Sequence, residues 1–341
     1  MEAKHYLVTG GAGFIGANLV ERLLSRGHDV TIYDNLSRRG ARINAAWLRE
    51  RHPGLRWLAA DVRDFEPLQQ AARDADVIVH LASQVAVTTS VVNPREDFEI
   101  NALGSFNVME AARLSPRQPS VLYASTNKVY GGMDDVVIVE QATRYAYRDL
   151  PHGVGETYPL DFHSRYGCSK GAGDQYVRDY ARIYGLRTVV FRQSAIYGPR
   201  QFGEEDQGWA AWFVIAAAMN RPITIYGDGK QVRDMLYVDD LLNAYETAVD
   251  RIDDVAGRVY NVGGGPANTI SVWTEFAPLL EKYLGRAIPV RRGDWRPGDQ
   301  KVCVMDIRKA ERELGWAPRV SFPAGLRRLV EWVQANRALF E

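Results

Sequence analysis

The sequence predicts an α/β protein built on a doubly wound parallel sheet, with a smaller, loop-rich C-terminal lobe. Two observations carry this prediction. Up to Arg192, short apolar runs rich in β-branched residues alternate with helical stretches, which is typical of a parallel sheet covered by helices on both faces. After Arg192, prolines, glycines, tryptophans and single arginines become frequent, which indicates loop-rich structure.

Six strands are expected, in the order 6–8, 30–33, 55–59, 77–79, 121–123 and 188–191. Between them we expect helices over 14–25, 67–72, 98–113 and 166–184. The last helix ends before Gly185, and glycine suits the position that follows a helix because it adopts positive φ freely. Gly171 and Gly173 inside this helix each cost about 1 kcal/mol relative to alanine, so we expect a backbone or ligand close by.

The composition excludes several classes of protein. Lysine plus arginine and aspartate plus glutamate both total 42, so no overall field would attract nucleic acid or an anionic membrane. The sequence starts without a secretory leader and has no apolar run of membrane-spanning length, which predicts a cytoplasmic protein. Its two cysteines, Cys168 and Cys303, have no metal-binding spacing and are expected to be buried packing residues, so no metal is predicted.

A glycine-rich turn follows the first strand and opens the first helix, with Gly10, Gly13 and Gly16 at intervals of three residues. Gly10 permits the tight turn, Gly13 lets the backbone approach a pyrophosphate, and Gly16 lets the helix lie close to the sheet. Asp34 ends the second strand, where a carboxylate accepts both hydroxyls of an adenosine ribose and repels a 2′-phosphate. The pattern predicts a Rossmann-type NAD site.

Arg38 and Arg39 leave NADP open as an alternative, because a guanidinium group can bind a 2′-phosphate. We expect them instead on a surface loop and favour NAD. Two further segments, which follow the third and fourth strands, are expected at the adenine and along the path to the nicotinamide: Asp61 with Val62, and Leu81 with Ala82.

Tyr166 and Lys170 lie one helical turn apart, so both side chains point to the same face of the predicted helix. A free phenol with a pKa of about 10 is a poor base at neutral pH. A nearby ammonium group favours the phenolate, so the spacing is typical of a general acid/base with its electrostatic partner. Because such pairs are common on solvent-exposed helices, the interpretation needs support from other segments.

That support comes from residues 123–131, Tyr-Ala-Ser-Thr-Asn-Lys-Val-Tyr-Gly, at the carboxyl end of the fifth strand. With the glycine pattern and the Tyr166 and Lys170 pair, the chain resembles the extended short-chain dehydrogenase/reductases that act on nucleotide sugars, over essentially its whole length. The resemblance implies that Thr126 hydrogen-bonds the reacting sugar oxygen and that Tyr166 is the acid/base. It also implies that Lys170 binds the nicotinamide ribose and lowers the pKa of the tyrosine. The cofactor-binding residues that it implies are Gly10, Gly13, Phe14, Ile15, Gly16, Asp34, Asn35, Ser37, Arg38, Asp61, Val62, Leu81, Ala82, Ser125, Tyr166, Lys170 and Gln193.

The same resemblance narrows the chemistry. Sugar 4,6-dehydratases of this family usually carry Asp-Glu after the threonine, because loss of water needs a carboxylic acid and a carboxylate base. This chain has Asn127 and Lys128 there, and it lacks the cysteine that 3,5-epimerases use near the same motif. The expected reaction is epimerisation by transient oxidation to a keto sugar and return of the hydride.

Segments 125–131, 160–164, 201–202 and 206–209 resemble a subfamily of epimerases that invert C2 of a CDP-linked sugar. A UDP-hexose 4-epimerase stays the alternative, because the inverted carbon depends on how the sugar is seated. A non-catalytic NAD-binding regulatory protein is the alternative from a different class. The resemblance places Arg233 and Arg296 at the diphosphate and Asp299 at a ribose hydroxyl. The substrate-binding residues that it implies are Gln84, Thr88, Thr126, Asn127, Gln201, Gln207, Arg233, Arg296 and Asp299.

The resemblance also implies a division into domains. Residues 1–192 with about 227–265 form the expected NAD-binding domain, and about 193–226 with 266–341 the nucleotide-sugar-binding domain. The helices at 98–113 and 166–184 resemble the family's dimer seam, so we expect a homodimer or a homotetramer.

Overall fold

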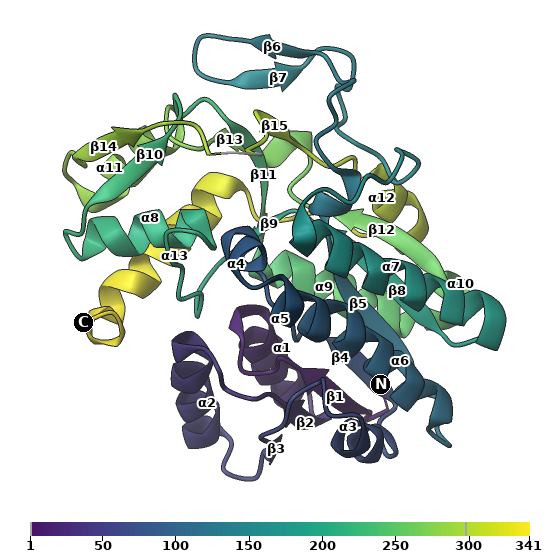
Figure 1. Cartoon of the computed structure of the whole chain (residues 1–341). Coiled ribbons are helices and arrows are strands. Elements are labelled where there is room, and N and C mark those ends of the chain that lie inside the picture. The colour runs from purple at the N-terminus through teal and green to yellow at the C-terminus, as the bar shows by residue number, and fades with distance from the viewer. Residues whose placement is uncertain (1, 297–298) are drawn as a thin grey trace. The chain divides into compact units, whose positions relative to one another are not determined.

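The computed structural model describes residues 2–296 and 299–341 (Figure 1). The chain folds into two compact units. Unit 1 comprises residues up to 131, 162–192 and 242–260, and unit 2 comprises 132–161, 193–241 and 261 onward. These boundaries differ from the expected division, since 132–161 and 227–241 lie in unit 2. The assignment of cofactor and substrate to separate domains stays a prediction.

A seven-stranded sheet forms the centre of unit 1, in the order β12-β8-β5-β4-β1-β2-β3. Strands β3, β2, β1, β4 and β5 pair in parallel. The chain places β2 and β3 on one side of β1 and then crosses to β4 on the other, so the order reverses beside β1, where doubly wound folds bind ligands. The strands are β1 His5–Thr9, β2 Asp29–Tyr33, β3 Arg56–Leu58, β4 Val77–His80, β5 Ser120–Thr126, β8 Thr188–Gln193 and β12 Arg258–Val262.

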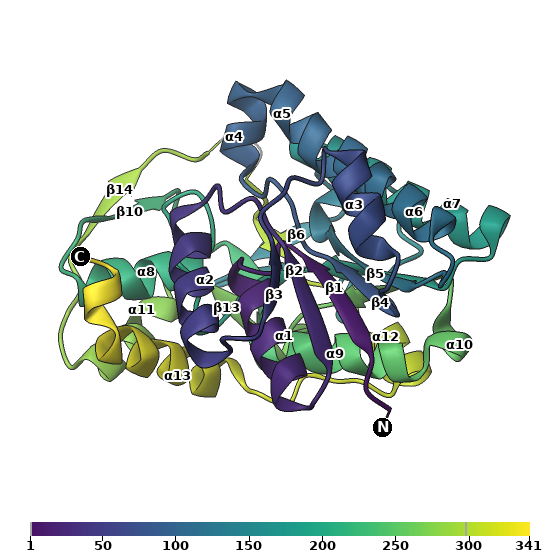
Figure 2. The same ribbon diagram turned by 90° about the horizontal axis from the view of Figure 1, so that it is seen from below.

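Helices cover both faces of this sheet, which confirms the predicted α/β fold. Helices α1 Phe14–Ser25 and α2 Arg39–Arg51 lie on one face, and α3 Phe65–Ala72, α6 Gly104–Leu114 and α7 Ser164–Tyr184 lie on the other (Figure 2). A large apolar core fills the space under α3, α6 and α7. Helices α9 Val238–Asp250 and α10 Ile252–Val255 precede β12.

The helix expected at 98–113 has a more complex form. A short helix α5, Pro94–Phe98, leads into a π-helical turn η1, Glu99–Leu103, which continues as α6. Helix α4 Val87–Val92 precedes it. At the junction of η1 and α6, the Ser105 hydroxyl donates to the Asn101 carbonyl at 2.5 Å. The widened turn belongs to a buried polar network beside α7, which apolar periodicity does not indicate.

Several elements of unit 1 were absent from the prediction, among them α2, α4, α10 and β12. Helix α2 occupies the segment that contains Arg39, which was expected on a loop; Arg38 is its N-cap residue and Arg39 its first residue. Its buried face consists of Ala41, Asn44, Ala45 and Leu48, and two small alanines with one polar asparagine give a weak apolar signal. Strand β12 at the edge of the sheet was also missed.

Unit 2 contains small sheets and helices around an aromatic core. Strand β11 Val232–Tyr237 pairs with β9 Ala195–Tyr197, β13 Thr269–Ser271 and β15 Val302–Cys303, while β10 Ile223–Tyr226 pairs with β14 Val290–Gly293. Strands β6 Ile138–Glu140 and β7 Tyr145–Tyr147 form an antiparallel hairpin (Figure 1). The remaining elements are η2 Asn127–Tyr130 in unit 1 and, in unit 2, α8 Trp209–Ala218, η3 Pro266–Asn268, α11 Phe276–Leu284, α12 Arg308–Leu314, α13 Phe322–Ala335 and η4 Arg337–Leu339. The rings of Trp209, Phe213, Trp273, Phe276 and Phe322 contact one another between the helices.

Candidate active site

The glycine turn between β1 and α1 has no room for side chains. Gly10 has a φ of +70°, and a Cβ atom there would lie 2.7 Å from the Ala82 nitrogen. At Gly16 a Cβ atom would lie 2.2 Å from the Gly10 carbonyl oxygen. Gly13 is the N-cap residue of α1, and the N–H groups of Phe14 and Ile15 follow in its first turn. This bare helix N-terminus at the reversal of strand order is the geometry that binds a dinucleotide pyrophosphate.

Asp34 follows β2 and is buried beside the glycine turn. Its carboxylate oxygens accept from the Ala12 N–H at 3.0 Å and the Leu36 N–H at 2.8 Å, and burial raises the pKa of the group. Each oxygen retains a lone pair for a ribose hydroxyl, so Asp34 fits the predicted role. Next to it, Asn35 accepts from the Ser37 N–H at 3.0 Å.

A hydrogen bond links the segment after β2 to the segment after β3, because the Asn35 amide donates to the Asp61 carboxylate at 2.8 Å. Burial alone would raise the pKa of Asp61, but hydrogen bonds from Arg63 and Asn35 outweigh it and lower the pKa to about 2. Val62 is buried against Gly104. After β4, the Leu81 and Ala82 N–H groups donate to Thr9, which fixes this segment beside the glycine turn.

Thr126 and Tyr166 meet at the carboxyl end of β5. Thr126 is the last residue of the strand, and Tyr166 lies in the first turn of α7. Burial raises the pKa of the Tyr166 phenol to about 12, and a hydrogen bond with the Thr126 side chain opposes this rise. The Thr126 hydroxyl also donates to the Asn127 side-chain amide oxygen at 3.2 Å. The structure therefore places the predicted acid/base and the predicted hydroxyl partner in contact.

Lys170 lies one turn further along α7 and is 3 % exposed. Its ammonium nitrogen lies 4.4 Å from the centroid of the Tyr123 ring. Burial lowers the pKa of Lys170 to about 7, although Asp174 and Asp97 oppose this fall. The pKa of Tyr166 is raised because burial of the phenol, with the charge of Asp97 adding to it, outweighs Arg38 and the hydrogen bond with Thr126. The expected lowering of this pKa by Lys170 stays a prediction.

A buried ion pair lies beside the end of β5. The Arg192 guanidinium donates to both oxygens of Asp174, at 2.9 and 3.1 Å, and to the Tyr130 hydroxyl at 3.1 Å. The Ser125 hydroxyl donates to the same carboxylate at 2.8 Å. Sequence reasoning missed this network, although a charged residue inside the apolar strand β8 indicates a buried partner.

A second network missed from the sequence surrounds Asp97. Its carboxylate accepts from the Ser169 hydroxyl at 2.6 Å, the Asn101 amide at 3.2 Å and the Gln84 amide at 3.3 Å. Gln84 was expected to bind substrate, but both ends of its amide contact protein, including the Ala86 N–H and carbonyl. The structure gives Gln84 a role in shaping this loop, and its contact with substrate stays a prediction. Thr88 lies exposed on α4.

In unit 2, carboxylates hold both arginines expected at the diphosphate. Arg233 donates to Asp299 at 2.7 Å. Arg296 pairs with Asp206 at 3.1 Å, and its guanidinium lies 3.9 Å from the centroid of the Tyr226 ring. Three further predicted residues are held by the protein itself. Gln201 donates to the Ile196 carbonyl at 3.3 Å, and the backbone of Gln207 pairs with that of Glu204. Gln193 is the last residue of β8 and is buried.

The two cysteines differ in their environments. Cys303 is buried in β15, as expected. Cys168 is exposed on α7, and its thiol donates to the Phe162 carbonyl at 3.2 Å, so the expectation that it is buried is wrong. Among the described residues, no group of three or more histidines, cysteines and carboxylates could hold a metal ion, and no helix is long and apolar enough to cross a bilayer.

The fold and these residues define a dinucleotide-binding enzyme of the short-chain dehydrogenase/reductase type. Residues 6–263 match the family model described as the NAD dependent epimerase/dehydratase family, and the chain belongs to this family. The NAD cofactor predicted from the glycine turn and Asp34 is therefore confirmed.

Individual relatives are similar over almost the whole chain. The CDP-paratose 2-epimerase of Salmonella typhi is 43 % identical over 336 residues, covering 96 % of this chain and 99 % of that protein. A putative UDP-glucose 4-epimerase of Methanocaldococcus jannaschii is 33 % identical, covering 97 % of this chain and 98 % of the relative. Among solved structures, the UDP-glucose 4-epimerase of Thermus thermophilus in complex with NAD has a TM-score of 0.82 and 32 % identity, covering 97 % of this chain and 99 % of that one.

Proposed function

We propose that the protein is an NAD-dependent nucleotide-sugar epimerase that inverts C2 of CDP-paratose to give CDP-tyvelose. The observation that carries this proposal is the 43 % identity to the CDP-paratose 2-epimerase of Salmonella typhi over nearly the full length of both chains. The contact between Thr126 and Tyr166 and the intact Lys170 support it, because a regulatory protein without catalysis would not need them.

Each side chain has a defined task in this proposal. Bound NAD would supply the acceptor and then the donor of the C2 hydride, so that no net redox change would result. Tyr166 accepts the proton of the C2 hydroxyl and later gives it back, while Thr126 hydrogen-bonds the same oxygen. Because the pKa of Tyr166 is about 12, its phenolate needs a positive charge nearby, and Lys170 supplies it when protonated.

The same site argues against loss of water. Several relatives at 31–32 % identity are dTDP-glucose 4,6-dehydratases. In this chain Asn127 and Lys128 follow Thr126 at the start of η2, and neither can serve as a carboxylic acid or a carboxylate base. We therefore expect the keto sugar to be reduced again without elimination.

A UDP-hexose 4-epimerase is the second candidate, favoured by the relative of Methanocaldococcus jannaschii and by the structure from Thermus thermophilus. Proton NMR of CDP-paratose with the protein in heavy water separates the two. Inversion at C2 without solvent deuterium at that carbon is expected. Deuterium at C2 would contradict direct oxidation there, and conversion of UDP-glucose but not CDP-paratose would contradict the CDP-sugar assignment.

A homodimer or homotetramer is part of this proposal. Helices α6 and α7 carry large apolar side chains on their exposed surfaces: Leu114, Tyr176, Ile183 and Tyr184. Light scattering after size exclusion should give a multiple of the 38.3 kDa chain mass, whereas a monomer at micromolar concentration would contradict it. We also propose a cytoplasmic location, because NAD and nucleotide sugars are cytoplasmic metabolites; cell fractionation tests it.

A further inference from the structure

Two buried carboxylates of unit 1 interact electrostatically with Lys170. Asp174 is one helical turn after Lys170 on α7, and Asp97 lies on α5. Their exposed fractions are 0 % and 1 %. Isolated charges of this kind are costly to bury, so each needs a compensating charge.

Asp174 has its compensating charge in Arg192. The guanidinium binds both carboxylate oxygens, at 2.9 and 3.1 Å, and is itself 2 % exposed. A planar guanidinium and a carboxylate joined by two hydrogen bonds match each other in charge and in geometry. Of the two carboxylates, Asp174 opposes the fall in the pKa of Lys170 more strongly than Asp97 does, but both of its oxygens are already hydrogen-bonded to Arg192.

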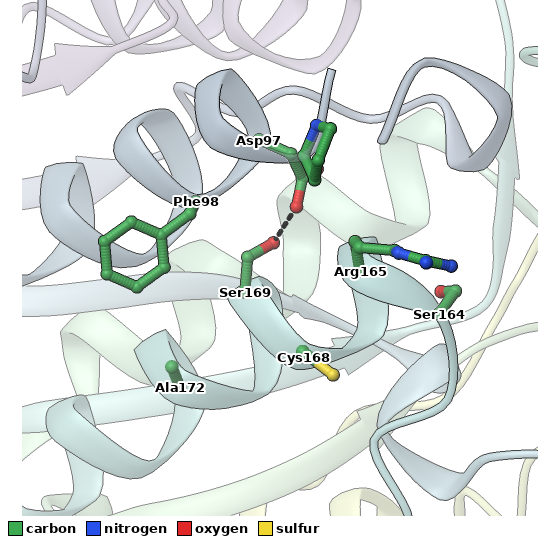
Figure 3. A pocket seen from close by; sticks show the side chains of 8 residues that line it. Asp97, Phe98, Ser164, Arg165, Cys168, Ser169 and Ala172 are labelled. Atoms are coloured by element: carbon green, nitrogen blue, oxygen red, sulfur yellow. Dashed lines mark hydrogen bonds between the residues drawn. The ribbon is translucent and has the colours of Figure 1, made fainter. Parts of the chain in front are cut away.

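Asp97 has only neutral hydrogen-bonding partners. Ser169, Asn101 and Gln84 donate to its carboxylate, and over residues 2–296 and 299–341 no lysine, arginine or histidine lies within ion-pair distance of it. The bond from Ser169, the residue immediately before Lys170, is the shortest at 2.6 Å (Figure 3). Asp97 thus brings one unmatched negative charge to the first turns of α7.

Lys170 is the complementary unmatched charge. In the part of the chain that the structure describes, its ammonium group has no ion-pair partner and lies over the Tyr123 ring. His80 is neutral, since burial, with Lys170 adding to it, lowers its pKa to about 3. The titratable or charged groups around Lys170 are His80 on β4, Tyr123 on β5, Arg192 on β8, Asp97 on α5, and Tyr166 and Asp174 on α7.

We propose that the Asp97 carboxylate is the counter-charge that holds the Lys170 ammonium in the buried site, with Ser169 fixing its position, so that Asp97 is a positioning residue of the reaction. Once Asp174 and Arg192 are paired, these two groups are the remaining opposite charges. The role in the reaction rests on the proposed epimerase activity. The pairing of charges stands on the structure alone.

Lysine NMR tests the pairing without turnover. The chain has seven lysines, so a protein labelled with ¹³C at lysine Cε gives few signals, and the spectrum of the K170M variant identifies that of Lys170. Asparagine at position 97 removes the charge and keeps an oxygen for the Ser169 hydroxyl. In D97N, the titration midpoint of Lys170 should therefore fall by about one pH unit or more, because an opposite charge nearby favours the ammonium form.

Two variants control this measurement. D97E keeps the charge and should leave the midpoint near that of the wild type. E96Q changes the neighbouring carboxylate on α5, which binds the Asn93 amide, and should also leave it unchanged. A midpoint in D97N within about 0.2 pH units of the wild type, or an equal shift in E96Q, would overturn the pairing.

Loss of folding in D97N would leave a second test. The D97N/K170M variant removes both charges together, so it should fold better than either single variant if the charges compensate each other. If the loss of free energy of unfolding in D97N/K170M equals the sum of the losses in the two single variants, the proposed pairing is wrong.

Turnover then tests the role in the reaction. The pH at which kcat on CDP-paratose falls on the alkaline side should be lower in D97N by the same amount as the NMR midpoint. In D97E it should be that of the wild type. An unchanged alkaline pH dependence of kcat in D97N would show that Asp97 has no role in the reaction. A wild-type protein with no activity would contradict the proposed function and leave the NMR result standing.

Discussion

Replacing Arg192 by methionine should destabilise the protein strongly, because it leaves the Asp174 carboxylate buried without its cation. The guanidinium makes two hydrogen bonds to Asp174 and one to Tyr130, and both charged side chains are almost fully buried. Breaking a buried ion pair by removing one partner costs about 3–5 kcal/mol. We expect a loss of free energy of unfolding in this range.

Urea unfolding followed by tryptophan fluorescence measures this loss. The R192M/D174N variant removes both charges, so it should recover a large part of the stability, since an uncompensated charge is what costs the energy. R187M, in which an exposed arginine near Asp253 is lost, is a matched control and should cost under about 1 kcal/mol. A loss below about 1 kcal/mol in R192M, or additive losses in R192M/D174N, would refute the reasoning.

Further predictions concern the catalytic and cofactor residues. Tyr166→Phe should lower kcat by about 10²–10⁴-fold while NAD stays bound, measured by sugar turnover and by absorbance of released cofactor; undiminished turnover would remove Tyr166 as the acid/base. Asp34→Asn should weaken binding of NAD more than that of NADP, measured by calorimetry, and equal losses would show that Asp34 does not contact the ribose. Gly16→Ala should abolish NAD binding or folding, because its Cβ atom would lie 2.2 Å from the Gly10 carbonyl oxygen. Lys170 has a folded-state pKa of about 7, below its unfolded value, so the unfolded chain binds more protons above pH 7 and stability should rise with pH there. Between about pH 7 and 9 the free energy of unfolding of the wild type should rise by on the order of 2 kcal/mol more than that of K170M, measured by urea unfolding. Parallel pH profiles of the two proteins would contradict the lowered pKa of Lys170.

The sequence predicted those parts of the fold that depend on apolar runs and on glycine. Helix α1 begins at Phe14 and ends at Ser25, as expected, because a glycine turn precedes it and its buried face repeats regularly. The inward face of α2 consists of two alanines, one asparagine and one leucine, whose burial depends on packing against α1. Local sequence does not carry that information.

The candidate site shows the same limit. Tyr166 and Lys170 share a helix, so their spacing alone placed them together. Asp97 contacts Ser169 only because α5 continues through a π turn into α6 and packs on α7, a tertiary arrangement with no sequence signature. Asp174 follows Lys170 by one turn, and that spacing could have indicated its place beneath the site.

The π turn η1 sets the rotation of α5 relative to α6. A π turn contains one residue more than an α-helical turn, and each residue of an α-helix corresponds to about 100° of rotation about its axis. Deleting a single residue from 99–103 would restore a continuous α-helix and would turn Asp97 by about this angle away from Ser169. One extra residue in this helix is therefore enough to bring the Asp97 carboxylate to Ser169, the residue next to Lys170.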